Sequence, residues 1–171
     1  MSEPEMTHLV RVTINGEAQE RVVQARQLLV HFIRDTLSLT GTHIGCDTGN
    51  CGACTILYDG EPIKSCMMFA AQADGASLET VESLSKPGEQ LAPLQQAFNE
   101  QHGLQCGWCT PGMLMQAKAL LERDSDPEVD TIRRALKGNI CRCTGYVNVV
   151  RAIQAAAGQP VTAGRTGQPE A

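Results

Sequence analysis

The segment CDTGNCGAC, residues 46–54, holds three cysteines with Gly49 and Gly52 between them. Glycine accepts positive φ angles and lets the backbone approach a ligand closely, so such a loop can turn several thiols toward one point. A fourth cysteine, Cys66, lies beyond Asp59-Gly60, which is a typical turn pair. We therefore expect a hairpin to bring Cys66 across to the loop, so that four thiols converge.

The four cysteines of this first group follow the spacing C-x4-C-x2-C with a distant fourth cysteine, which is the spacing of plant-type [2Fe–2S] ferredoxins. In such a site four thiolates hold a small anionic cluster of iron and sulfide. We therefore predict that the first group binds a [2Fe–2S] cluster. Its members are Cys46, Cys51, Cys54 and Cys66.

A second group of four cysteines has the spacing C-x2-C and, further along the chain, C-x-C. The first pair directly precedes Thr110-Pro111, a predicted helix start, whose free N–H groups and positive dipole end favour a nearby anion. We predict a second [2Fe–2S] cluster here, and Arg142 within the C-x-C pair either offsets the cluster charge or faces water. The members of this second group are Cys106, Cys109, Cys141 and Cys143.

Zinc and disulfides are the alternatives for these cysteines. A C-x2-C unit with a second tight pair also fits zinc, so zinc at both groups, or at the second group alone, stays open. Disulfides would leave the ferredoxin spacing unexplained. The first ten residues also lack the apolar core of a secretory signal. We therefore expect the reducing cytoplasm, where cysteines bind metal more often than they pair.

Composition excludes several classes of partner. The net charge is −5 and no run of Lys or Arg occurs, so nucleic acid and anionic membrane surfaces are poor partners. No apolar run reaches the length of a transmembrane helix. The chain of 171 residues suits one domain or two small ones, and it holds only two Tyr, three Phe and one Trp. Small domains with so few aromatic residues need staples such as metal centres.

The N-terminal half has the alternation that is typical of strands. Val10, Val12 and Ile14 share one face of a predicted strand, and the following Asn15-Gly16 is a strong hairpin signal. The fold class is therefore expected to be α+β, with a plant-type ferredoxin-like β-grasp domain over 1–82. Its predicted elements are strands 8–14, 19–23, 55–58 and 62–66 and a helix with apolar residues at helical spacing over 27–37.

The C-terminal half contains only helical patterns. Segment 83–93 holds Pro, Gly and polar residues, which indicates a linker. Thr110-Pro111 and Asp126-Pro127 each place an N-cap residue before a proline at the first helical position. We predict an all-α, four-helix domain over 94–158 and a disordered tail over 159–171. The predicted helices are 94–102, 110–123, one from Asp126-Pro127 to Gly138, and 146–157.

Four segments together resemble one known family. They are HIGCDTGNCGACT at 43–55, KSC at 64–66, QCGWCTPGM at 105–113 and GNICRCTGY at 138–146. In this combination and order they resemble the iron–sulfur subunit of the molybdenum hydroxylases, the xanthine oxidase family, over residues 10–157. Within that family, LTGTHIGCDT at 39–48 and HGLQCGWCTPGMLM at 102–115 look most like the small subunit of aerobic carbon monoxide dehydrogenase.

The resemblance implies an electron-transfer subunit of an oxidoreductase complex, with no catalytic residue of its own. Such a subunit pairs with a large molybdopterin-binding subunit and a medium FAD-binding subunit, and we expect a dimer of heterotrimers. By position, the second group of cysteines would hold the molybdenum-proximal cluster and the first group the flavin-proximal one. Gln105 matches a family glutamine that hydrogen-bonds the pterin; alternatively it is an ordinary polar residue beside the cluster loop.

Other functions remain as alternatives. The complex could oxidise aldehydes, purines or N-heterocycles instead of carbon monoxide, because the residues that choose the substrate lie on the large subunit of this family. A stand-alone ferredoxin would explain the first group of cysteines but not the helical half. An iron–sulfur sensor would normally add a DNA-binding element. No nucleophile motif, phosphate loop or Rossmann fingerprint indicates substrate chemistry on this chain.

Overall fold

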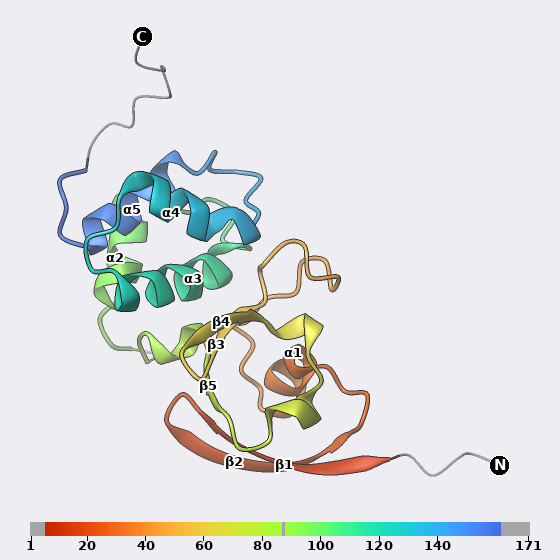
Figure 1. Cartoon of the computed structure of the whole chain (residues 1–171). Coiled ribbons are helices and arrows are strands. Elements are labelled where there is room, and N and C mark those ends of the chain that lie inside the picture. Colours follow the sequence, from red (N-terminus) through yellow and green to blue (C-terminus); the bar gives the residue numbers. More distant parts are fainter. Residues whose placement is uncertain (1–5, 87, 162–171) are drawn as a thin grey trace.

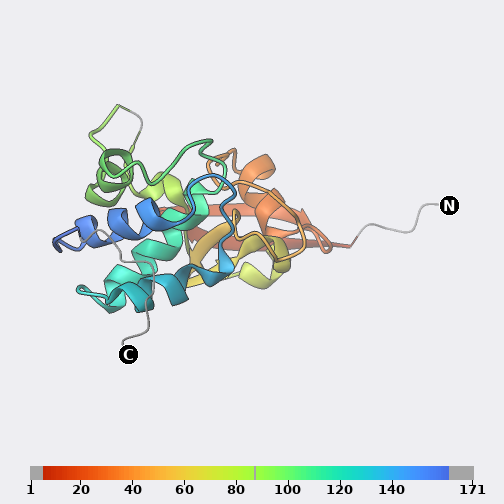
Figure 2. The ribbon, with the colours of Figure 1, turned by 90° about the horizontal axis from the view of Figure 1, so that it is seen from above.

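The computed structural model describes residues 6–86 and 88–161. A mixed five-stranded sheet with a short helix forms the N-terminal half, and four helices form the C-terminal half (Figure 1). The two halves lie side by side in both views of the ribbon (Figures 1 and 2). The α+β class and the order of the two domains are therefore as predicted. Across the described residues no helix is both long and apolar enough to cross a membrane.

The sheet is built from two hairpins. Strand β1 (Thr7–Ile14) pairs antiparallel with β2 (Glu17–Gln24), and β3 (Thr55–Tyr58) pairs antiparallel with β4 (Glu61–Lys64). Strand β5 (Ser77–Glu79) joins the hairpins, parallel to β1 and antiparallel to β3, which gives the order β2-β1-β5-β3-β4. Both turns have positive φ at their two central residues, as a tight primed turn requires. Both predicted hairpins are confirmed.

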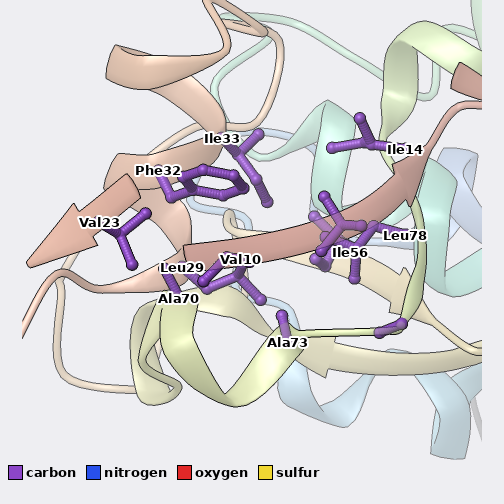
Figure 3. Packing of buried hydrophobic residues seen from close by; sticks show 12 residues of the cluster. Val10, Ile14, Val23, Leu29, Phe32, Ile33, Ile56, Ala70, Ala73 and Leu78 are labelled. Atoms are coloured by element: carbon purple, nitrogen blue, oxygen red, sulfur yellow. The ribbon is translucent and has the colours of Figure 1, made fainter. Parts of the chain in front are cut away.

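One face of the sheet carries the N-terminal core. Helix α1 (Leu29–His31) continues as a π-helical turn (Phe32–Thr36), in which the N–H of Leu37 bonds to the carbonyl of Phe32 at 3.0 Å. Leu29, Phe32 and Ile33 pack against the inward side chains of β1, β3 and β5 (Figure 3). The helix predicted over 27–37 therefore begins later, because Leu28 is extended and takes part in a β-bridge.

The structure differs from the sequence prediction at two places in this half. Strand β4 ends at Lys64, and Cys66 lies in a 3₁₀ turn (Ser65–Met67) rather than at the end of a strand. The turn forms because the Ser65 hydroxyl and N–H both donate to the carbonyl oxygen of Cys54, at 2.8 and 3.2 Å. Strand β5 was not predicted, because only Leu78 is buried among its three residues and no alternation marks it.

The C-terminal half packs four helices around a second core. They are α2 (Pro93–Glu100), α3 (Thr110–Arg123), α4 (Val129–Ala135) and α5 (Val147–Ala156). Phe98, Met113 and Ile153 are buried at its centre. Three further 3₁₀ turns are Ala70–Ala73 and Val81–Ser83 in the first half and Leu136–Gly138 directly after α4. Gly138 thus ends the last helical turn, as predicted.

Two predicted N-caps are wrong. Thr110 is already helical, since Cys109 occupies the cap position, and the Thr110 hydroxyl is buried without a hydrogen-bond partner among the described residues. Helix α4 begins two residues after Asp126-Pro127, at Val129, because Glu128 is still extended. The Asp126 carboxylate accepts a hydrogen bond from Gln159 instead. Gln159, the first residue of the predicted tail, is thus hydrogen-bonded to Asp126. Residues 162–171 of that tail lie outside the described residues.

The segment predicted as a linker is partly packed. Leu84 within that segment, and Val81 just before it, contact both the helical core and a small cluster in which Leu57 of β3 meets Met115 and Ala119 of α3. Helix α3 therefore lies directly against β3 and joins the two halves. The boundaries 1–82, 83–93 and 94–158 stay predictions.

Candidate metal centres

The first group of cysteines lines a loop that turns through positive φ at Gly49 and Gly52. The N–H groups of Cys51 and Thr48 donate to Cys46 Sγ at 3.3 and 3.5 Å. These two hydrogen bonds lower the pKa of Cys46 to about 6, and the bond from Cys51 has the larger effect. The loop is therefore built to stabilise a thiolate, which is the form that binds metal.

The same group has an inner side. Cys54 and Cys66 are buried and lie beside each other. Burial raises the pKa of Cys54 to about 11, the N–H of Cys66 opposes that rise and the Cys66 thiol adds to it. The four thiols thus form two neighbouring pairs, Cys46 with Cys51 near the surface and Cys54 with Cys66 inside.

The second group is also made of two pairs. Cys106 and Cys143 are exposed, with their sulfurs 3.5 Å apart. Cys109 and Cys141 lie deeper, and burial, followed by the neighbouring Cys141 thiol, raises the pKa of Cys109 to about 12. Burial also acts to raise the pKa of Cys141, but the hydroxyl and N–H of Thr144, at 3.2 and 3.5 Å from its sulfur, outweigh it and lower that pKa.

The two cysteine loops touch each other. The N–H of Ile140, next to Cys141, donates to the carbonyl oxygen of Cys51 at 2.8 Å. Asn139 is buried, and its amide donates to the Gly52 carbonyl at 2.9 Å and to the Thr55 hydroxyl at 3.2 Å. One hydrogen bond thus links a residue of the first group directly to a neighbour of the second.

A ring contact forms a second link between the loops. The rings of His43 and Trp108 stack with their centroids 4.7 Å apart, and His43 Nδ1 lies 2.9 Å from the Trp108 carbonyl oxygen. Trp108 is 54 % exposed, so it covers the seam between the loops and is not a core residue. Gln105 and Arg142 are exposed as well, each beside a cysteine of the second group.

The contacts at this seam were missed from the sequence. Asn139 is part of the segment GNIC, but an asparagine after a glycine usually indicates a turn. His43 lies at no ligand spacing from another histidine, so the sequence indicates no role for it. Only the closeness of these residues in the fold identifies them, because their partners are more than 60 residues away along the chain.

The thiols fit a two-iron cluster better than a single zinc ion. A [2Fe–2S] cluster takes four cysteine thiolates, two on each iron, and both groups offer two pairs of sulfurs. A zinc ion would draw four ligands to one point.

Two family profiles divide the chain as the cysteines do. The 2Fe-2S iron-sulfur cluster binding domain matches residues 12–85, and a [2Fe-2S] binding domain matches residues 80–154. Subunit gamma of caffeine dehydrogenase from Pseudomonas sp. (strain CBB1) is 54 % identical over an alignment of 154 residues, which covers 86 % of this chain and 90 % of that subunit. The chain belongs to the small iron–sulfur subunits of the molybdenum hydroxylases.

Other proteins of this family are similar over comparable lengths. The small subunit of nicotine 6-hydroxylase from Paenarthrobacter nicotinovorans is 48 % identical, over 88 % of this chain and 90 % of its own. The solved structure of quinoline 2-oxidoreductase from Pseudomonas putida 86 contains a chain that is 46 % identical with a TM-score of 0.85, covering 89 % of this chain and 94 % of that one. As an iron–sulfur subunit the chain carries two [2Fe–2S]-binding domains and is the non-catalytic part of an oxidoreductase complex.

Proposed function

We propose that this subunit relays electrons from a molybdopterin centre on a large partner to FAD on a medium partner. Each [2Fe–2S] cluster, when bound, takes up and passes on one electron. The ligands are proposed to be the two groups of cysteines defined above, with the second group facing the molybdopterin. The single observation that carries this proposal is the contact between the loops, in which Ile140 donates to the carbonyl of Cys51.

The exposure of the thiols supports the assigned direction. Cys106 and Cys143 are open to a partner, whereas the buried Cys141 lies next to the residue that contacts the first group. The second group therefore has one side toward the outside and one side toward the first group. A relay between a partner and the first group needs both.

Gln105 is proposed to contact the molybdopterin. It is exposed and directly precedes the exposed Cys106, so it lies on the side of the second group that a partner can reach. A glutamine amide both donates and accepts hydrogen bonds, as a pterin ring does. Such a bond contributes on the order of 1 kcal/mol, and an unsatisfied partner costs about 1–3 kcal/mol.

The substrate of the whole complex has two candidates. Carbon monoxide, inferred from the similarity of segments 39–48 and 102–115, stays a prediction. The proteins reported above are named for caffeine, nicotine and quinoline, all of them N-heterocycles. These names favour the oxidation of an N-heterocycle as the second candidate. Reduction of the complex by each compound, followed optically, would separate them. The cytoplasm as compartment is proposed on the cysteine content, because cysteines bind metal more often than they pair in a reducing compartment. A dimer of heterotrimers as assembly is proposed on the family resemblance.

Purification through a tag on this subunit tests the proposal. We expect two larger chains to accompany it, one with molybdopterin and one with FAD, each in about equal amount to the subunit. The Gln105→Leu variant should keep the iron content and the partners but lose molybdopterin or accept electrons from molybdenum more slowly, about tenfold for a loss of about 1.4 kcal/mol.

Gln24→Leu is the matched control, since Gln24 is an exposed glutamine on β2. It should behave as the unaltered subunit does. A subunit that is fully loaded with iron and elutes alone would instead indicate a stand-alone ferredoxin. Unchanged cofactor content and unchanged reduction rates in Gln105→Leu would leave Gln105 as an ordinary loop residue.

A further inference from the structure

Lys64 reaches across the first cysteine loop from the end of β4. Its Nζ donates to the carbonyl oxygen of Gly49 at 2.6 Å, and Gly49 lies between Cys46 and Cys51. The same Nζ is 3.6 Å from where a Cβ on Gly138 would lie, at the start of the segment that leads to Cys141. The ammonium group therefore lies between the two cysteine loops and contacts the first.

This charge has no acidic partner among the described residues, since none of their ion pairs includes Lys64. The one acidic residue of the loop 46–54 is Asp47, which is exposed and whose carboxylate lies 4.0 Å from His31 Nε2. Lys64 is itself half-buried. Its charge is therefore neither paired with a carboxylate nor fully surrounded by water.

From this placement we propose that Lys64 sets the reduction potential of the N-terminal cluster. The proposal rests on the ligands assigned above. Reduction adds one electron and so one negative charge to a centre that is already anionic, and a nearby positive charge favours the reduced form. In the proposed relay the reduced cluster of the helical half would give up one electron and become oxidised, and the oxidised N-terminal cluster would gain it and become reduced. The positive charge of Lys64 would make this transfer more favourable.

The hydrogen bond gives Lys64 a second effect on the loop. The carbonyl of Gly49 and the N–H of Asn50 belong to one planar trans peptide, so holding the carbonyl fixes the direction of that N–H. The N–H groups on either side of this peptide, those of Thr48 and Cys51, donate to Cys46 Sγ. Charge and bracing must therefore be separated in the test.

Three variants separate them in the purified complex. Lys64→Gln keeps a hydrogen-bond donor but removes the charge, Lys64→Met removes both, and Lys64→Arg keeps the charge. Lys86→Gln removes the same charge from an exposed site in the segment between the domains. EPR-monitored redox titration gives the potential of each cluster, and the signal of the N-terminal cluster is the one that Cys51→Ser abolishes.

We expect Lys64→Gln and Lys64→Met to lower the potential of the N-terminal cluster by similar amounts. The ratio of oxidised to reduced cluster at the original midpoint should rise about tenfold, which is about 59 mV for one electron. Lys64→Arg and Lys86→Gln should stay near the original value, and the other cluster should move less. An unmoved potential in Lys64→Gln, with both signals present, would overturn the role of Lys64 and leave the ligand assignment intact. Absence of cluster signals from the unaltered complex would instead overturn the proposed function.

Discussion

Replacing Cys109 with serine is expected to empty the second metal centre and to leave the first one loaded. Serine offers a hydroxyl that stays protonated where the thiolate of a cysteine would bind iron. The second group then has three thiolates for a cluster that needs four. Iron should fall from about four to about two per chain, and the EPR signal of the helical half should disappear. The first half keeps its own core, so it should still fold and bind its cluster.

The same change should stop the passage of electrons through the complex. Substrate should still reduce molybdenum, while flavin reduction by substrate should slow by a factor of about 100 or more, since even the loss of an outer partner of a metal ligand costs about 10–100-fold. The matched variant is Cys51→Ser, which should remove the other EPR signal. Normal flavin reduction in Cys109→Ser, or loss of both signals in each variant, would contradict two independent centres in series.

Gly112→Ala is expected to destabilise the protein by disturbing the packing between its two halves. A Cβ on Gly112, in the first turn of α3, would lie 2.1 Å from the carbonyl oxygen of Gly52 and 3.1 Å from Ala53. These are backbone atoms, so α3 or the cysteine loop must move. Overpacking of this kind costs about 1–3 kcal/mol. The melting temperature should therefore fall by about 2–12 °C, at about 2–4 °C per kcal/mol for a chain of this size.

The sign of this effect makes the test sharp. Alanine has the better helix propensity, by up to about 1 kcal/mol, so a helix that did not touch the loop would become more stable. Gly138→Ala is the control, because its φ is not positive and the nearest atom to its Cβ would be Lys64 Nζ, in ordinary contact at 3.6 Å. It should leave the melting temperature nearly unchanged. Equal or higher stability of Gly112→Ala would show that the halves do not pack as described.

The parts of the fold that could be predicted depend on short stretches of sequence. Asn15-Gly16 and Asp59-Gly60 each specify a tight turn by themselves, because few residues accept positive φ at both central positions. The end of α3 at Arg123 was predicted correctly and its start was missed by one residue, since its apolar spacing and its proline lie within the helix. The two groups of cysteines were found for the same reason: their spacing can be recognised before any tertiary contact is known.

What could not be predicted depends on contacts between distant residues. Gly112 would be judged from sequence as a weak point in a helix, whereas in the fold it is the place where α3 touches the first cysteine loop. Asn139 and Lys64 look like ordinary polar residues until the loops lie side by side. Cys66 was placed on a strand because the bonds from Ser65 to the carbonyl of Cys54, which form the 3₁₀ turn, leave no local pattern.

The central claim is that this chain holds two [2Fe–2S] clusters, and iron and acid-labile sulfide measured on the same anaerobic preparation test it most directly. The account predicts about four irons and about four sulfides per chain, with little zinc. Cys109→Ser and Cys51→Ser should each contain about half of both. Stoichiometric zinc without labile sulfide in the unaltered chain would contradict the account, because the paired thiols would then hold single ions.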